Sequence, residues 1–133
     1  AALRTAFDKT VADPKLLAHW LTEGGKVEPV IGDKDIYGDG TVTMLSAPGH
    51  TPGRYALLVR LQKKGNVLLS GDVVHFEEQF KNKGVPGFNT SRAETLASMD
   101  RIQKMAAALK ATLVVQHDAN DIGKLPAFPT AAE

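Results

Sequence analysis

Residues 66–70 of the chain, with the sequence NVLLS, are apolar without the alternation of a half-exposed strand. Such a run is typical of a strand covered on both faces, which requires a layered fold with other elements on either side. Residues 67–70 form the first strand candidate and residues 55–61 the second, and the turn Lys63-Lys64-Gly65-Asn66 joins the two. The sequence therefore predicts an internal strand pair.

The N-terminal part of the chain contains one helix signal and one hairpin signal. Asp13-Pro14 places an N-cap and a first-turn proline before an apolar stretch that ends at Gly24-Gly25, which predicts a helix over residues 13–24. Residues 26–32 and 35–45 are rich in β-branched side chains, and the second stretch is broken at Gly38-Asp39-Gly40. This pattern predicts a hairpin or a strand–turn–strand unit.

The second half of the chain predicts a loop, a helix and a last strand. Residues 75–89 show no periodicity and are interpreted as a loop. Ser91 and Glu94 form a capping box, and the apolar residues behind it recur at helical spacing, so that one face packs on a sheet: Ala93, Leu96, Ala97, Ile102, Met105, Ala106 and Leu109. Residues 111–117 then form a short buried strand ending at His117, and the tail around Pro126 and Pro129 is irregular. We expect an α/β (α+β) fold in a single domain over residues 1–133, without an interdomain linker.

Composition excludes several classes of partner. The net charge is +1 and the basic residues are scattered, which argues against nucleic acid or an anionic membrane as the partner. No apolar run reaches the roughly 20 residues of a membrane span. The start, AALRTAF, has neither an initiator Met nor a signal-peptide pattern, as in a processed or truncated chain. The compartment stays open, with the cytoplasm favoured.

Candidate metal ligands follow the predicted strands. The chain has no cysteine, which excludes disulfides and thiolate catalysis and leaves histidines and carboxylates as metal ligands. His50, Asp72 with His75, and His117 each come just after a strand, where distant parts of a chain converge at one edge of a sheet. Imidazole nitrogen and carboxylate oxygen are the donors that a divalent transition metal takes from such a set.

Each of these residues also has a plainer interpretation. A single His near a strand end is more often a surface or hydrogen-bonded core residue than a ligand. Asp72 after Ser-Gly is equally typical of a turn, and His19 within its helix is interpreted as structural. Taken alone, the residues predict no more than a candidate metal site.

Three segments together resemble a known family. SAPGHTPGRYALLV is similar to the His-containing turn of metallo-β-lactamase superfamily hydrolases, LLSGDVVHF to their Gly-Asp strand end, and LVVQHD to the strand that delivers their last His. GFNTSRAETLASMDRI followed by QHD most resembles the N-acyl-homoserine lactonase-like members. The resemblance covers residues 40–118 and implies half of an αββα sandwich, a mixed sheet with helices on one face.

The resemblance implies roles for the ligand set. His50 would bind one metal ion, Asp72 would bridge two, and His117 would bind the other. The two divalent ions would be Zn²⁺, although Mn, Fe or Co also suit such donors. In this family a bridging hydroxide attacks a carbonyl, which would open a lactone to a hydroxy acid. Asp72, where zinc β-lactamases commonly have Cys, favours the lactonase and glyoxalase-like branches.

The chain departs from the family pattern in two ways. The His-x-His-x-Asp-His run that supplies most family ligands is absent. The chain would therefore be the C-terminal half of the fold, with three ligands that cannot fill two metal sites. His75 stands where lactonases often have Tyr. It would either polarise the substrate carbonyl as a catalytic residue beside Asp72, or form a supporting hydrogen bond.

Other functions remain open beside the lactonase interpretation. A glyoxalase-type thioester hydrolase or an organophosphate hydrolase would share the ligands and differ in loop 76–90. In that loop Phe76, Phe80 and Phe88 are placed to pack an acyl chain or, alternatively, to make core or dimer contacts. A catalytically incomplete binding or structural half-domain is the non-enzymatic alternative. Half a sandwich exposes an apolar sheet face, so we expect the missing N-terminal half or a homodimer partner, besides a small ester or lactone substrate.

Overall fold

The computed structural model describes residues 18, 26, 28–127 and 129–133. Apart from Ala18, the helix predicted over residues 13–24 lies outside the described residues, as does His19. Residues Ile31–Glu133 form one compact unit, separate from Ala1–Val30, and the fold described below is that of this unit.

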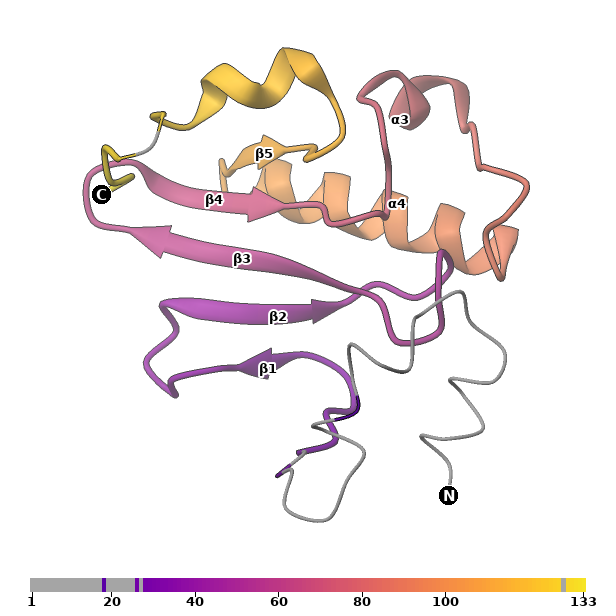
Figure 1. Ribbon diagram of the computed structural model, residues 1–133, viewed down its shortest axis with the longest axis horizontal. Coiled ribbons are helices and arrows are strands. Elements are labelled where there is room, and N and C mark those ends of the chain that lie inside the picture. The colour runs from indigo at the N-terminus through magenta and orange to yellow at the C-terminus, as the bar shows by residue number, and fades with distance from the viewer. Residues whose placement is uncertain (1–17, 19–25, 27, 128) are drawn as a thin grey trace. The chain divides into compact units, whose positions relative to one another are not determined.

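The unit is built on a five-stranded mixed sheet in the order β1-β2-β3-β4-β5 (Figure 1). The first four strands are antiparallel neighbours, and β5 runs parallel to β4 after the long helix α4 (Arg92–Ala108). This connection through a helix is what a parallel pair requires. The strands are β1 (Lys34–Asp35), β2 (Val42–Ser46), β3 (Tyr55–Leu61), β4 (Gly65–Leu69) and β5 (Thr112–Val114).

Strand β4 has the predicted burial on both faces. Successive residues of a strand point to opposite sides, and both Val67 and Leu68 are buried. The strand begins two residues earlier than predicted, because Gly65 and Asn66 pair with Leu61 and Arg60 of β3. The turn is therefore shorter than Lys63-Lys64-Gly65-Asn66, and Gly65 has the positive φ of 76° that a tight reversal needs.

The predicted hairpin is present, but the predicted position of its first strand is wrong. Residues 26 and 28–32 carry no strand, and β1 consists of residues 34 and 35 instead. Two carboxylates explain the shift. Asp33 accepts a hydrogen bond from the Ser46 backbone N–H (2.9 Å) where the chain leaves the sheet edge, and Asp35 accepts one from the Gly40 N–H (2.7 Å) and shapes the turn.

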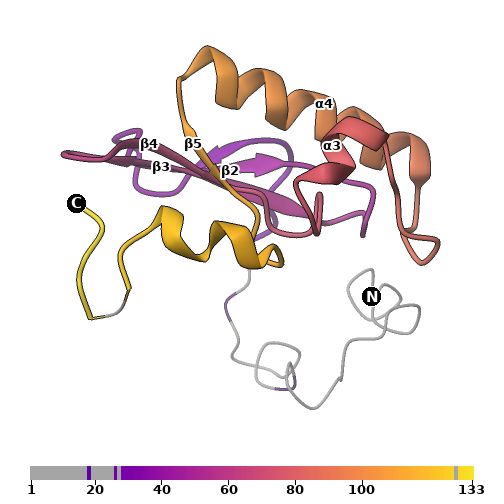
Figure 2. The ribbon, with the colours of Figure 1, turned by 90° about the horizontal axis from the view of Figure 1, so that it is seen from above.

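Helix α4 (Arg92–Ala108) confirms the predicted long helix, which packs on one face of the sheet. Met99 and Ile102 are fully buried against β-strand residues such as Leu58 and Leu68. Figure 2 shows α4 and the short helix α3 (Glu78–Asn82) on one side of the sheet and the 3₁₀ helix η1 (Ala119–Lys124) on the other.

Most of the predicted face of α4 packs on the core, as Ile102 and Ala106 show, but the first two turns differ. Ala93 and Ala97 are exposed, whereas Thr95 and Ser98 are buried. Their hydroxyls make burial possible because each donates to a carbonyl, Thr95 to Ser91 (2.7 Å) and Ser98 to Pro48 (2.7 Å).

Two further boundaries differ from the prediction. Residues 75–89 contain helix α3 (Glu78–Asn82), because the Gln79 side chain accepts the backbone N–H groups of His75 and Phe76 at its start, and Phe80 is buried. Strand β5 ends at Val114, three residues before His117, where the chain turns into η1. Among the described residues of the tail, 126–133 without 128, there is no helix or strand, as predicted.

The sheet face opposite α4 is apolar and only part-buried. Alternation along β2, β3 and β4 places Met44, Leu57, Val59, Leu61 and Leu69 on this face. None of the described helices is long and apolar enough to cross a membrane.

Candidate metal centre

Three loops that follow strands bring the predicted ligands together. His50 follows β2, Asp72 follows β4, and His117 follows β5. The Asp72 carboxylate lies between the two imidazoles, with Oδ1 3.0 Å from His117 Nε2 and Oδ2 3.8 Å from His50 Nε2. The convergence that the sequence predicted at this edge of the sheet is present.

Asp72 is placed by a sharp turn at the end of β4. Gly71 has φ 59°, and a Cβ there would lie 2.9 Å from the Tyr55 carbonyl oxygen, so only glycine allows this close approach to β3. The Gln116 side-chain oxygen accepts from Gly71 N–H (2.8 Å) and from the Ser70 hydroxyl (3.0 Å). Gln116 therefore ties the end of β4 to the segment that delivers His117.

His75 lies at the same centre. Its ring stacks on His117 with 5.0 Å between centroids, and its centroid is 5.7 Å from that of His50. Burial lowers the pKa of His75, the neighbouring His117 lowers it further, and Asp72 opposes them. These effects together favour the neutral imidazole of His75, and its buried Nδ1 has no hydrogen-bond partner among the described residues.

Of the three loop aromatics, only Phe88 borders the centre. Its ring lies edge-on at 5.8 Å from His50 and 5.9 Å from His75 and is 71% exposed. Phe80 is buried in the core, and Phe76 is half-exposed. The core interpretation is thus confirmed for Phe80, and Phe88 is the aromatic placed to meet a ligand.

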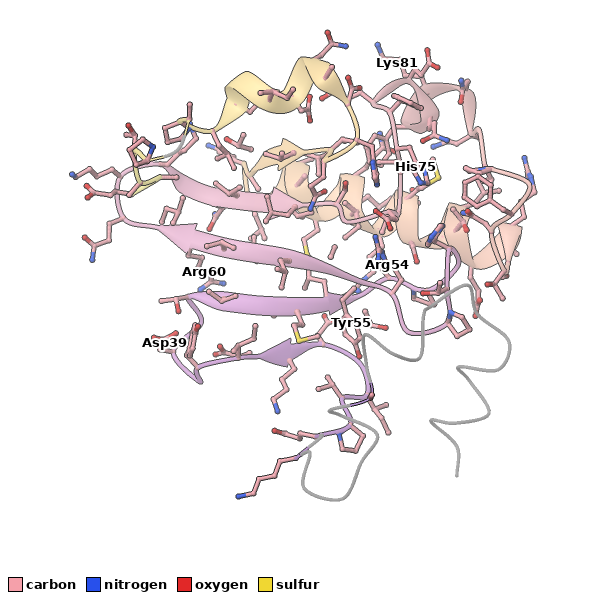
Figure 3. All side chains as sticks on the ribbon, viewed as in Figure 1. Asp39, Arg54, Tyr55, Arg60, His75 and Lys81 are labelled. Atoms are coloured by element: carbon pink, nitrogen blue, oxygen red, sulfur yellow. The ribbon has the colours of Figure 1, made fainter. Side chains whose placement is uncertain are left out.

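Arg54 is a site residue that sequence reasoning missed. Its guanidinium forms an ion pair with the Asp72 carboxylate. Figure 3 shows Arg54 and His75 at the same end of the sheet, whereas Arg60 lies at the far end of β3. The available signal was a cation four residues after His50, inside the motif SAPGHTPGRYALLV.

Asn89 was also missed. Its side-chain oxygen lies 3.0 Å from His50 Nδ1, on the side of the imidazole opposite Nε2, which faces Asp72. The two residues are 39 positions apart in the sequence, so no local pattern links them.

The donor types fit a divalent cation, because two imidazole nitrogens flank one carboxylate. The described part of the chain does not close a metal site by itself: no group of three His, Asp or Glu residues there is placed to hold an ion. Asp72 is instead neutralised by Arg54 and contacts His117. Further donors and a displacement of Arg54 would be needed.

No protein-family model matches the chain. Among curated proteins, N-acyl homoserine lactonase AttM of Azorhizobium caulinodans is 39% identical over 84 residues, covering 63% of this chain and 32% of the relative. An N-acyl homoserine lactonase of a Bacillus species is 35% identical over 107 residues, covering 76% of this chain and 42% of the relative. The chain thus spans about a third of the length of the first and about two fifths of the second.

Solved structures share the fold. An N-acyl homoserine lactone hydrolase, solved with N-hexanoyl-L-homoserine bound at its catalytic metal centre, superposes with a TM-score of 0.69 at 23% identity. The match covers 85% of this chain and 48% of that one. A structure described as a probable metal-dependent hydrolase from Staphylococcus aureus gives a TM-score of 0.58 at 12% identity, over 67% of this chain and 31% of that one.

These relatives confirm the resemblance predicted from the motifs. Over the matched residues the chain is homologous to N-acyl homoserine lactonases, and its mixed sheet with helices matches the fold of the N-acyl homoserine lactone hydrolase structure.

Proposed function

We propose, on the premise of this homology, that the native protein is a metal-dependent hydrolase that opens the lactone ring of an N-acyl homoserine lactone. The observation that carries the proposal is the position of Asp72 between His50 and His117 at the strand ends of a lactonase-like fold. Two histidines from separate loops face this one carboxylate, which is the arrangement expected of a shared ligand set and not of unrelated surface histidines.

The proposed ligand roles follow from this arrangement. His50 and His117 would each hold one divalent ion, and Asp72, with an oxygen directed toward each imidazole, would contact both. Zn²⁺ suits these donors, as do Mn, Fe and Co. When bound, such ions would polarise the lactone carbonyl and lower the pKa of a water molecule.

His75 is proposed to donate a hydrogen bond to the substrate carbonyl oxygen. Its lowered pKa favours the neutral ring, which has one N–H to donate. A donor held in place before the reaction stabilises negative charge that develops on that oxygen. In the alternative role, His75 would form a supporting hydrogen bond to a metal ligand, and only the metal ions would polarise the substrate carbonyl.

We also propose that a further half of the fold supplies the remaining ligands and covers the free sheet face. Three donors cannot fill two metal sites, and the face with Met44, Leu57 and Val59 is apolar and part-exposed. Intact mass and size-exclusion measurements on the native protein test this. A chain longer than 133 residues supports the proposal, whereas a dimer of 133-residue chains would assign the covering role to a second copy.

A substrate panel tests the proposed activity. The native protein, freed of metal by a chelator and then reloaded with Zn²⁺, would be assayed on an N-acyl homoserine lactone, a thioester and a phosphotriester. We expect lactone opening that is lost with the chelator and restored by Zn²⁺. Preferred turnover of the thioester or phosphotriester would assign another branch of the superfamily. No turnover by the metal-loaded protein would instead favour a non-catalytic half-domain.

A further inference from the structure

The turn that carries His50 rests on the N-terminal end of α4. The Gly49 carbonyl accepts from Ser91 N–H (2.9 Å), and the His50 carbonyl accepts from Thr90 N–H (3.2 Å) and the Thr90 hydroxyl (3.0 Å). The backbone of His50 is therefore held by the segment that starts α4. The Ser91 hydroxyl also caps α4 by accepting from Glu94 N–H (3.3 Å). The predicted capping box is incomplete, because the Ser91 N–H donates to the Gly49 carbonyl and not to the Glu94 side chain.

A chain of side-chain hydrogen bonds runs from this helix end to the imidazole. The Thr95 hydroxyl donates to the Ser91 carbonyl (2.7 Å), the Asn89 amide nitrogen donates to Thr95 Oγ1 (3.1 Å), and the Asn89 oxygen lies 3.0 Å from His50 Nδ1. Asn89 is part-buried, so water competes little for its hydrogen bonds with Thr95 and His50.

The direction of every bond in this chain is determined by its first acceptor. The Ser91 carbonyl can only accept, so the Thr95 hydroxyl uses its single proton there. Thr95 Oγ1 can then only accept from Asn89, which fixes the amide with its nitrogen toward Thr95 and its oxygen toward His50. An oxygen cannot donate, so His50 must present a proton on Nδ1.

We propose that Asn89 is a positioning residue that holds neutral His50 as the Nδ1–H tautomer, with the unprotonated Nε2 facing Asp72. This inference rests on the proposed function for its purpose, because a metal ion binds only the bare nitrogen of an imidazole. A neutral imidazole can carry its proton on either nitrogen. Without Asn89, part of the population would have a proton on Nε2, where the lone pair is required.

The first test is the tautomer of His50 in the metal-free native protein, read from the ¹⁵N shifts of its ring nitrogens. Spectra are recorded near pH 8.5, about two units above the ordinary His pKa. We expect a protonated Nδ1 and a bare Nε2 in the wild type and in Asn89→Asp, which keeps an accepting oxygen. Asn89→Leu should show a mixture or the opposite tautomer, and Asn82→Leu, in the same connecting region, should match the wild type.

Thr95→Val provides a second route if Asn89→Leu does not fold. It is nearly isosteric and removes only the hydroxyl that fixes the Asn89 amide, so the Nδ1–H signal should weaken. An Nδ1–H tautomer that is unchanged in both Asn89→Leu and Thr95→Val would overturn the proposal. So would a wild-type His50 that carries its proton on Nε2.

Titration with Co²⁺ alone separates this inference from the proposed function. Loss of a partner that orients a ligating His typically weakens metal binding 10- to 100-fold. We expect a loss of that size in Asn89→Leu, with a changed visible spectrum, and near wild-type binding in Asn89→Asp. If the wild type has the Nδ1–H tautomer but binds no Co²⁺, the positioning role stands and the metal-dependent function fails. Equal Co²⁺ binding in Asn89→Leu would contradict the positioning role.

Discussion

Gly49 packs directly against Thr95 at the start of α4. A Cβ on Gly49 would lie 2.5 Å from the Thr95 hydroxyl oxygen and 2.6 Å from its Cα, and would overlap its backbone nitrogen. The φ of Gly49 is 135°, which side chains rarely adopt. The residue before His50 therefore has no room for a side chain and no ordinary backbone alternative.

Gly49→Ala should destabilise the protein by about 2 to 4 kcal/mol, since backbone strain and overpacking add together. Urea unfolding of the native protein measures the change. Gly53→Ala is the control, because no atom lies within 4 Å of its Cβ position and its φ is ordinary; its effect should stay within about 0.5 kcal/mol. Equal unfolding midpoints for the two variants would show that the Gly49–Thr95 contact is not tight.

Arg54→Gln should raise the affinity for Zn²⁺. The guanidinium competes for Asp72 through a part-exposed ion pair. A pair of this kind is worth about 1 kcal/mol, or roughly a fivefold change in affinity. Isothermal titration gives the constants, with Arg60→Gln at the far end of β3 as the matched control. Weaker Zn²⁺ binding in Arg54→Gln would mean that Arg54 supports the site rather than competing for it.

His75→Ala should lower lactone turnover about 100- to 1,000-fold, as the loss of one preorganised donor does. Metal content should be unchanged, because His75 is not among the proposed ligands. His75→Gln keeps a donor and should recover part of the rate. Steady-state kinetics and metal analysis on the same samples check both expectations, and unchanged turnover in His75→Ala would refute the catalytic role.

Asp118 should make stability depend on pH in the acidic range. Hydrogen bonds from the backbone N–H groups of Glu77 and Asn120 hold the pKa of this carboxyl below its usual range. A folded-state pKa below the unfolded one adds stability above the unfolded pKa, and this is lost as pH falls through the folded pKa.

In Asp118→Asn one accepting oxygen becomes a donor and opposes a backbone N–H. Chemical unfolding between neutral pH and about pH 3 should show a less stable variant at neutral pH and a gap that narrows in acid. Asp100→Asn, which alters only an exposed ion pair with Lys104, should follow the wild type. If the stability difference between Asp118→Asn and the wild type is constant from neutral pH to about pH 3, Asp118 is not the source of the pH dependence.

Elements with a strong local signal could be predicted from the sequence. Residues 67–69 are uniformly apolar and lie in strand β4, and the helix predicted from Ser91 onward is α4. The grouping of His50, Asp72 and His117 was predictable because each follows a strand, and strands of one sheet bring their ends together.

Features that depend on distant partners could not be predicted. The roles of Asn89 and Arg54 arise from contacts with His50 and Asp72, across 39 residues for Asn89. The predicted face of α4 left out Thr95 because the hydropathy pattern treats this side chain as polar, whereas its hydroxyl is satisfied within the fold. Helix α3 depends on one side chain, Gln79, that accepts two N–H groups at its start.

The metal content of the native protein tests the central claim, that His50, Asp72 and His117 are one ligand set. Protein loaded with Zn²⁺ and freed of unbound ions would be analysed by mass spectrometry for zinc per folded chain. The account predicts about two ions in the wild type. It also predicts clear losses in His50→Ala, Asp72→Ala and His117→Ala, with none in the control Asp39→Ala. A wild-type zinc content in Asp72→Ala would contradict it.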